Sequence, residues 1–261
     1  MEKVTRAQLK KVRELLREKS ARDESGLFVA EGIKIISDIL TKGYPLESLL
    51  VSGDFAGDPA NRSLLETAET RSIPVAVAAN KDFEKASSLK SSQGILAVIK
   101  KPATSSLAVK AGLVVLCDGI QDPGNLGTMI RTSVAFKADA VLLTGESVDI
   151  YNPKVVRSSS GMILDIPVHV CDISGIEQLK EKGYHLLASK VEGRASECVS
   201  DIKKFTTPLI IVFGSEGKGI SANILEMADG FFHIPIDERV ESLNVTAAAA
   251  VALFVLSGNK Q

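Results

Sequence analysis

Apolar residues recur along this chain in two ways. In residues 5–19 they fall at every third or fourth position, so they line one face of a helix. Residues 112–117 and 209–213 are instead almost wholly apolar, which is typical of strands covered on both faces of a sheet. The first pattern predicts amphipathic helices and the second predicts interior strands.

The first hundred residues alternate between these patterns on a small scale. The predicted helices span residues 5–19, 31–40, 60–70 and 81–89, and the predicted strands span residues 46–51, 74–78 and 94–99. Residues 100–107 then bring lysines, a proline and small polar side chains, which is typical of a linker. We therefore assign residues 1–100 to a small α/β domain, 101–110 to a linker and 111–261 to a second domain.

The second domain has longer and more apolar strands. The predicted strands span residues 112–117, 140–144, 166–170, 184–189, 209–213 and 231–236. The predicted helices span residues 125–137, 153–162, 176–182, 222–228 and 245–256. Helices between nearly continuous apolar strands predict an α/β fold with a largely parallel sheet and helices on both faces.

Composition restricts the class of protein. With 45% hydrophobic and 24% charged residues, the composition of the 261-residue chain is typical of a soluble globular protein. Its apolar runs are too short to cross a membrane, and its charged beginning does not resemble a secretory signal. Cys117, Cys171 and Cys198 have no metal-ligand spacing. We therefore expect free thiols, no metal and a cytoplasmic protein.

Charge is distributed unevenly. Residues 1–22 hold eight lysines and arginines against three glutamates, in a chain whose net charge is −1. A basic leading helix suits an anionic partner, and nucleic acid is the partner that we expect, with Lys10, Lys11 and Arg13 as candidate contacts. A solvated helix face is the alternative.

Three junctions are rich in glycine and polar residues, and each follows a predicted strand. They span residues 118–131, 213–219 and 232–256. Open α/β sheets bind ligands at the carboxyl ends of their strands, so these junctions are the candidate site. Residues 213–219 do not have the glycine spacing of a phosphate loop or of a dinucleotide-binding fingerprint. Their glycines instead predict that some other ligand approaches the backbone closely.

The first and third junctions each open a predicted helix. Asn125 is placed at the helix N-cap, and Arg131 on the second turn offers a planar fork of donors for phosphate. Ser242 and Asn244 can accept hydrogen bonds from the first turn of the alanine-rich last helix. Taken singly, Arg131 pairing with a surface carboxylate and Glu216 as a solvated loop acid are the alternatives.

Together these segments resemble a known family. The similarity rests on Asn125 followed after five residues by Arg131, on residues 152–161, on the loop 213–219, and on Ile234-Pro-Ile236 followed by Ser242-Leu-Asn244. In this order they resemble the motifs of the SpoU/TrmH family of SPOUT RNA methyltransferases, over residues 113–256. Residues 1–100 are similar to the substrate-binding domain often found before them, which resembles the ribosomal L30e-type α/β fold.

The resemblance implies transfer of a methyl group from S-adenosylmethionine to a ribose 2′-hydroxyl in RNA. It also implies a deep trefoil knot in the C-terminal domain and a homodimer formed through that domain. The implied cofactor-binding residues are Gly214, Ile234, Leu243 and Ser242. The implied catalytic residues are Arg131, oriented by Asn125, together with Glu216 and Asn244.

The RNA target stays open at this point. Arg157 is a further candidate RNA contact, and an L30e-like domain favours 23S ribosomal RNA over tRNA. A non-catalytic RNA-binding protein with a vestigial methylase domain is the alternative from another class. An ATPase is disfavoured because the phosphate loop is missing.

Overall fold

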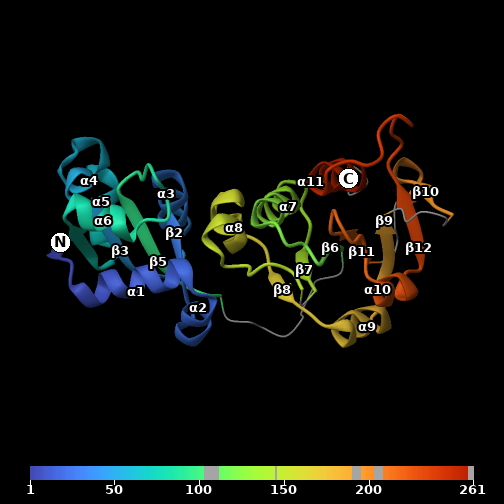
Figure 1. Ribbon diagram of the computed structural model, residues 1–261, viewed down its shortest axis with the longest axis horizontal. Helices are drawn as coiled ribbons and strands as arrows, with labels where there is room; N and C mark the ends of the chain where they lie inside the picture. The colour runs from blue at the N-terminus through green and yellow to red at the C-terminus, as the bar shows by residue number, and fades with distance from the viewer. Residues whose placement is uncertain (103–111, 145, 190–194, 203–207, 258–261) are drawn as a thin grey trace. The chain divides into compact units, whose positions relative to one another are not determined.

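The computed structural model describes residues 1–102, 112–144, 146–189, 195–202 and 208–257 of the chain (Figure 1). By their internal contacts the residues form two compact units. The first unit comprises residues 1–103 and 151–161, and the second comprises residues 104–150 and 162–261. The segment 151–161 thus groups with the first unit, and the domain boundaries at residues 100 and 111 remain a prediction.

A mixed five-stranded sheet forms the centre of the first unit. Its strand order is β1-β4-β3-β5-β2, with β1, β4 and β3 parallel and with β5 antiparallel to β3 and β2. The strands span β1 Glu2–Lys3, β2 Leu27–Glu31, β3 Leu46–Ser52, β4 Val75–Ala78 and β5 Ile95–Lys100.

Helices cover both faces of this sheet. They span α1 Arg6–Arg17, α2 Lys19–Ser25, α3 Ile33–Lys42, α4 Gly53–Gly57, α5 Arg62–Thr70, α6 Asn80–Ala86 and α8 Pro153–Ser158, with a 3₁₀ turn at Pro59–Asn61. The buried face of α1 shares one core cluster with Phe83 and Ala86 of α6. Helix α8 packs against β2, where the ring of Tyr151 lies 4.8 Å from that of Phe28.

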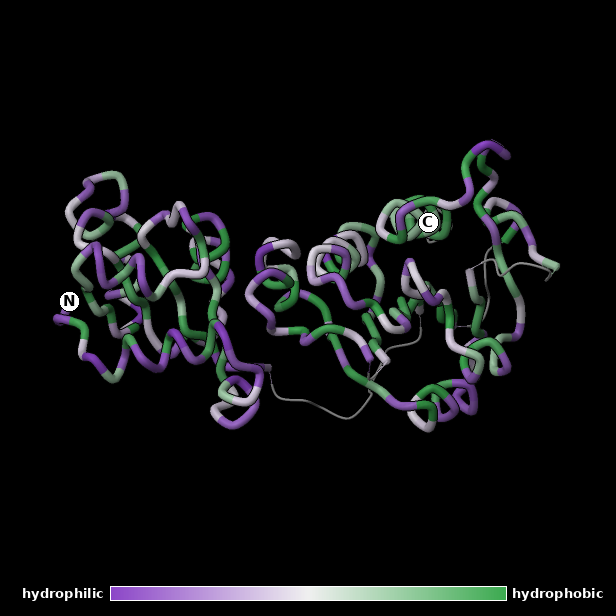
Figure 2. Tube along the Cα trace, viewed as in Figure 1, coloured by the Kyte–Doolittle hydropathy of each residue, from purple (hydrophilic) through white to green (hydrophobic). Residues whose placement is uncertain are grey.

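Seven strands form the sheet of the second unit, in the order β10-β12-β9-β11-β6-β7-β8, and every neighbouring pair is parallel. They span β6 Leu113–Asp118, β7 Ala140–Leu143, β8 Val168–Val170, β9 His185–Ser189, β10 Glu197–Cys198, β11 Leu209–Gly214 and β12 Gly230–His233. Figure 2 shows that the strands are largely hydrophobic, while hydrophilic residues occur mostly in loops and on helices.

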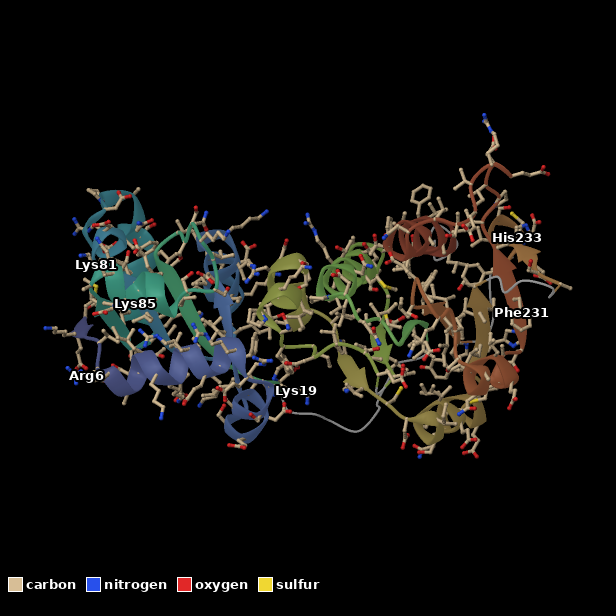
Figure 3. The ribbon with its side chains drawn as sticks, in the orientation of Figure 1. Arg6, Lys19, Lys81, Lys85, Phe231 and His233 are labelled. Atoms are coloured by element: carbon tan, nitrogen blue, oxygen red, sulfur yellow. The ribbon has the colours of Figure 1, made fainter. Side chains whose placement is uncertain are left out.

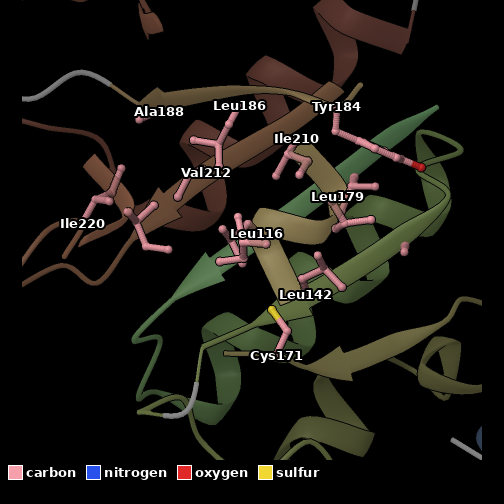
Figure 4. Close-up of a cluster of buried hydrophobic side chains, with 14 residues drawn as sticks. Leu116, Leu142, Cys171, Leu179, Tyr184, Leu186, Ala188, Ile210, Val212 and Ile220 are labelled. Atoms are coloured by element: carbon pink, nitrogen blue, oxygen red, sulfur yellow. The ribbon is translucent and has the colours of Figure 1, made fainter. Parts of the chain in front are cut away.

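Two layers of helix enclose this sheet. They span α7 Pro123–Ala135, α9 Ile173–Glu181, α10 Ala222–Met227 and α11 Val245–Ser257, with 3₁₀ turns at Met162–Leu164 and Val199–Asp201. Helices α9 and α10 cover one face through a core cluster that includes Leu116, Leu142, Leu179 and Ile210 (Figure 4). Helices α7 and α11 pack against each other and against β7 and β11. The predicted α/β class, with a parallel sheet covered on both faces, is confirmed.

Several local predictions need correction. Residues 27–31 form strand β2, and the helix predicted from residue 31 starts at Ile33 because Gly32 takes a φ of 117°. Helix α8 ends at Ser158, since Ser160 and Gly161 both have positive φ. Strands β1 and β10 and helices α2 and α4 were not predicted, because they are short and lack apolar periodicity.

Candidate active site

The polar junctions meet at one edge of the second sheet. Strands β6 and β11 are neighbours in register, so Asp118 and Gly214 pair at their carboxyl ends. The loop after β6 leads into α7, and the loop after β11 spans residues 215–221 before α10. Parallel strands place these loops on the same side, as expected for a ligand site in an α/β sheet.

Glu216, in the second junction, contacts a residue of the first junction and a residue of the third. Its Oε1 atom accepts a hydrogen bond from Nδ2 of Asn125 at 3.1 Å and another from Nδ2 of Asn244 at 2.5 Å. Three side chains predicted from separate segments are therefore in direct contact. The Glu216 carboxylate is exposed, so it aligns the two side-chain amides and does not act as a buried charge.

Asn244 also begins helix α11. Its Oδ1 atom accepts hydrogen bonds from the backbone N–H of Thr246 at 2.9 Å and from the Thr246 hydroxyl at 2.5 Å. These are the contacts of a helix N-cap, and they use the amide oxygen while the amide nitrogen faces Glu216. The predicted capping role of Asn244 is confirmed, and it orients the side chain toward the site.

Gly214 occupies a position that admits no side chain. A Cβ atom built there would lie 2.2 Å from the backbone carbon of Gly219, because Ser215 and Gly219 pair across a tight hairpin. The Ser215 N–H donates to the Gly219 carbonyl at 3.1 Å, and the Gly219 N–H donates back at 2.8 Å. Residue 214 is glycine because the loop folds directly over it.

Helix α7 begins earlier than predicted. Its N-cap is Asp122, whose carboxylate accepts from the N–H of Asn125 at 2.9 Å, and Pro123 fills the first helical position. Asn125 is therefore not the N-cap; it lies in the first turn, and its side chain is left to contact Glu216. Proline at the first position of a helix is a signal that would have identified Asp122.

Arg131 is exposed on the third turn of α7. It is six positions after Asn125, which puts it about 9 Å farther along the helix axis and about 120° around it. The two side chains thus leave the helix in different directions. The orientation of Arg131 by Asn125 remains a prediction.

The segment between β12 and α11 carries the other predicted cofactor residues. Within the described part of the chain, the backbone N–H and C=O groups of Ile234 and Leu243 have no hydrogen-bond partner. Both residues are partly buried, and Ser242 beside them is exposed. Available backbone groups beside apolar side chains fit a cofactor held through the main chain, which is what the resemblance implies.

Asp118 belongs to this edge, and sequence reasoning gave it no role. Its side chain is buried, with 5% of its surface exposed. One oxygen accepts from the Thr144 hydroxyl at 2.9 Å and the other from the N–H of Ser221 at 2.6 Å. The single available signal is a carboxylate directly after an apolar strand.

The predicted RNA contacts of α1 differ in availability. Lys10 and Lys11 are exposed, although Lys10 lies 3.6 Å from Glu14 and Lys11 lies 3.9 Å from Glu47. Arg13 is half-buried, and its Nε atom is buried without a hydrogen-bond partner in the described residues.

Other cations stand beside them. The exposed Arg6 and Arg17 of α1 and Lys81 of α6 have no acidic partner among the residues that the structure describes. Lys85 of α6 is also exposed, and its Nζ atom lies 3.9 Å from a carboxylate oxygen of Asp82; Figure 3 labels Arg6, Lys81 and Lys85. Lys81 and Lys85 were missed because α6 is not basic overall.

Arg157 lies in the first unit. Its Nη1 atom donates to the Ser88 hydroxyl at 2.9 Å, and that hydroxyl donates to Oε2 of Glu31 at 2.8 Å. Glu31 is buried and also accepts from Ser87 and Ser92. Arg157 is thus held in a network within the protein, and its contact with RNA remains a prediction.

No group of three or more potential metal-binding side chains occurs in the described residues. Among the helices described, none has both the length and the apolar character needed to span a bilayer.

Comparison with known proteins decides the family. The model of the SpoU rRNA Methylase family matches residues 112–254, which is more than half of the chain. The chain belongs to the SpoU rRNA methylase family. The model of the MRM3-like substrate binding domain matches residues 6–97. The resemblance drawn from the motifs is therefore confirmed.

Relatives in the SpoU family align over nearly the whole chain. The 23S rRNA (guanosine(2553)-2'-O)-methyltransferase RlmP of Bacillus subtilis is 31% identical, and the match covers 99% of this chain and 100% of that protein. The 23S rRNA (uridine(2479)-2'-O)-methyltransferase of Streptomyces viridochromogenes is 28% identical over 92% of this chain and 85% of its own.

A solved SpoU structure matches equally widely. The SpoU methyltransferase AviRb from Streptomyces viridochromogenes, crystallised with AdoMet, superposes with a TM-score of 0.83 at 26% identity. The superposition covers 97% of this chain and 98% of AviRb. Both units therefore have counterparts in one SpoU protein.

Proposed function

We propose that this protein transfers a methyl group from S-adenosylmethionine to a ribose 2′-hydroxyl of RNA, with 23S ribosomal RNA as the favoured target. The observation that carries the proposal is the contact of Asn125, Glu216 and Asn244, three motif residues that meet at one sheet edge in a SpoU-family chain. S-adenosylmethionine supplies an activated methyl group when it is bound.

Cofactor binding is assigned to the loops after β11 and β12. Gly214 allows the backbone of its loop to approach a ligand closely, and the available peptide groups of Ile234 and Leu243 supply donors and acceptors. Ser242 adds a hydroxyl. Glu216 holds Asn125 and Asn244 in place around the same loops, so these three residues shape the site rather than react.

Arg131 is assigned to the RNA. A guanidinium stays protonated, so it is a poor base but a strong donor to phosphate and to a developing alkoxide. In the proposed reaction Arg131 binds the RNA phosphate and stabilises the alkoxide, while the phosphate or water takes the hydroxyl proton. Alignment and electrostatic stabilisation are then the main contributions of the protein.

Ribosomal RNA is favoured because two relatives that align along most of the chain are named as 23S rRNA methyltransferases. The first unit, whose Arg6, Arg17 and Lys81 have no acidic partner within the described residues, is assigned to phosphate contacts. A tRNA substrate is the second candidate. A protein acting on ribosomal RNA as it matures is expected in the cytoplasm.

We assign the exposed apolar side chains of α11 to a homodimer contact. Phe254 is 67% exposed and Val251 is 39% exposed, on a helix that is otherwise strongly apolar. The Phe254 ring lies 6.0 Å from that of Phe136, so the apolar surface continues beyond α11. Large exposed aromatics on a globular protein are typical of an interface.

The target can be tested in cells. Ribosomal RNA and tRNA from a strain that lacks the gene are digested to nucleosides and oligonucleotides and compared by mass spectrometry with the parent strain. Loss of one 2′-O-methyl group from 23S RNA, restored by the intact gene and not by an Arg131→Ala copy, is the expected result. Loss from tRNA alone would select the second candidate, and no loss would reject the enzyme function.

A further inference from the structure

The buried carboxylate of Asp118 has an unusual set of partners. Both of its oxygens accept hydrogen bonds, from the Thr144 hydroxyl at 2.9 Å and from the Ser221 N–H at 2.6 Å. No lysine, arginine or histidine pairs with it within the described ranges. A carboxylate removed from water is costly unless strong donors replace its hydration, and here two fixed protein donors do so.

These donors belong to different loops of the same edge. Thr144 follows β7, and its hydroxyl also accepts from the N–H of Gly119 at 2.9 Å, in the loop that leads to α7. Ser221 comes two residues after Gly219, at the end of the glycine loop and at the N-cap of α10. Asp118 therefore connects the exits of β6, β7 and β11.

The glycine loop is consequently fixed at both ends. At its start Gly214 lies in the strand, paired with Asp118 in the β6–β11 ladder. At its end the backbone of Ser221 is bound to the carboxylate of that same residue. One amino acid thus sets the span within which Gly214–Gly219 must fold into its tight hairpin.

We infer that Asp118 is a positioning residue for cofactor binding, which acts through the Ser221 N–H to hold the glycine loop in its binding conformation. The inference rests on the proposed function, since the ligand of that loop is taken to be S-adenosylmethionine. Asp118 does not touch the reacting atoms. Its contribution differs from that of Glu216, which joins the glycine loop to Asn125 and Asn244 through exposed hydrogen bonds that compete with water.

A pair of variants at residue 221 isolates the decisive contact. Ser221→Pro removes the N–H that Asp118 accepts, and the native φ of −65° is the angle that proline requires. Ser221→Ala keeps the N–H, and the Ser221 side chain makes no capping hydrogen bond that the change could remove. The ring carbon of proline takes the place of that hydrogen, so the carboxylate must also move away, and the two variants compare a loop bound to Asp118 with a loop released from it.

A second pair of variants, at Thr144, tests the other carboxylate oxygen of Asp118 without introducing a proline. Thr144→Val removes the hydroxyl at nearly constant volume, and Thr144→Ser keeps it. Each full-length variant is first checked by circular dichroism. Should Ser221→Pro fail to fold, the Thr144 pair and Asp118→Asn carry the test.

Binding is measured by titration calorimetry with S-adenosylmethionine and, separately, by filter binding of ribosomal RNA. We expect Ser221→Pro and Thr144→Val to weaken cofactor binding about tenfold, the effect of leaving one buried donor or acceptor unsatisfied. Ser221→Ala, Thr144→Ser and all RNA affinities should match the unaltered chain. A purely structural role would lower RNA and cofactor binding together.

The outcomes distinguish failure of this inference from failure of the proposed function. Equal cofactor affinity within both pairs, or an equal loss of RNA affinity, would overturn the positioning role alone. Failure of the unaltered chain to bind S-adenosylmethionine would overturn the proposed function, and the role of Asp118 with it.

Discussion

The second unit gathers its polar side chains at one edge of a parallel sheet, whereas the first unit spreads its charges over the outer faces of helices. Glu216, Asn125 and Asn244 bind one another, and Asp118 binds two loops at once. On α1 and α6 the cations stand apart, some without an acidic partner in the described residues. A coupled site should fail when one member changes, while a distributed surface should weaken by increments.

The largest effect is expected at Arg131. Arg131→Lys keeps the positive charge but loses the planar fork, so turnover should fall about 100-fold, in the range for loss of a donor that stabilises a transition state. Affinity for S-adenosylmethionine should not change. Single-turnover methylation with saturating RNA measures the effect, and near-normal turnover by this variant would remove Arg131 from its proposed role.

Gly214 should give the next largest effect. In Gly214→Ala the new methyl meets the backbone of Gly219 at 2.2 Å, so the hairpin must move. We expect about 30-fold weaker binding of S-adenosylmethionine, equivalent to about 2 kcal/mol. Gly217→Ala is the matched control, because a Cβ there meets no atom within 4 Å. Equal affinities of the two variants, measured by calorimetry, would separate this loop from the cofactor.

Two variants of Glu216 show whether its hydrogen bonds or its negative charge matters for catalysis. Glu216→Gln retains an Oε1 acceptor for the two asparagine amides, and Glu216→Ala removes it. If Glu216 shapes the site, the alanine variant should lose about tenfold in kcat/KM and the glutamine variant about twofold, since the contacts are exposed and open to water. Equal losses in steady-state assays would instead assign a role to the negative charge.

Small effects that add up are expected in the first unit. Replacing Arg6, Arg17 or Lys81 by glutamine should weaken RNA binding about threefold each and lower the slope of log affinity against log salt by about one per phosphate contact. The triple variant should keep full affinity for S-adenosylmethionine. Lys42→Gln, on α3, serves as a control for net charge. A triple variant with an unchanged salt slope would move the RNA surface elsewhere.

Much of the second unit follows from local sequence. Strands such as residues 209–213 and helices such as 245–256 are specified by their own apolar runs, and glycine-rich junctions mark the sheet edge. The motif residues could be named for the same reason. Their contacts could not, because Glu216 meets Asn125 and Asn244 across 91 and 28 residues of chain.

What sequence reasoning missed depends on tertiary partners. Asp118 gains its role from Ser221, 103 residues away, and nothing near it in the sequence signals that contact. Arg22 in α2 is buried because it donates to the carbonyl of Leu15, although its neighbours are polar. Tyr151 and Arg157 pack with the first unit through Phe28 and Ser88, which no local pattern indicates.

The central claim is tested most directly by following the methyl group itself. The purified full-length protein is incubated with ribosomal RNA and S-adenosylmethionine that carries an isotopically labelled methyl group, and the RNA is digested to nucleosides for mass spectrometry. The account predicts label in one 2′-O-methylnucleoside, at one position of 23S RNA, and none with the Arg131→Ala protein. Label on a base, or no label in RNA while the cofactor binds, would contradict it.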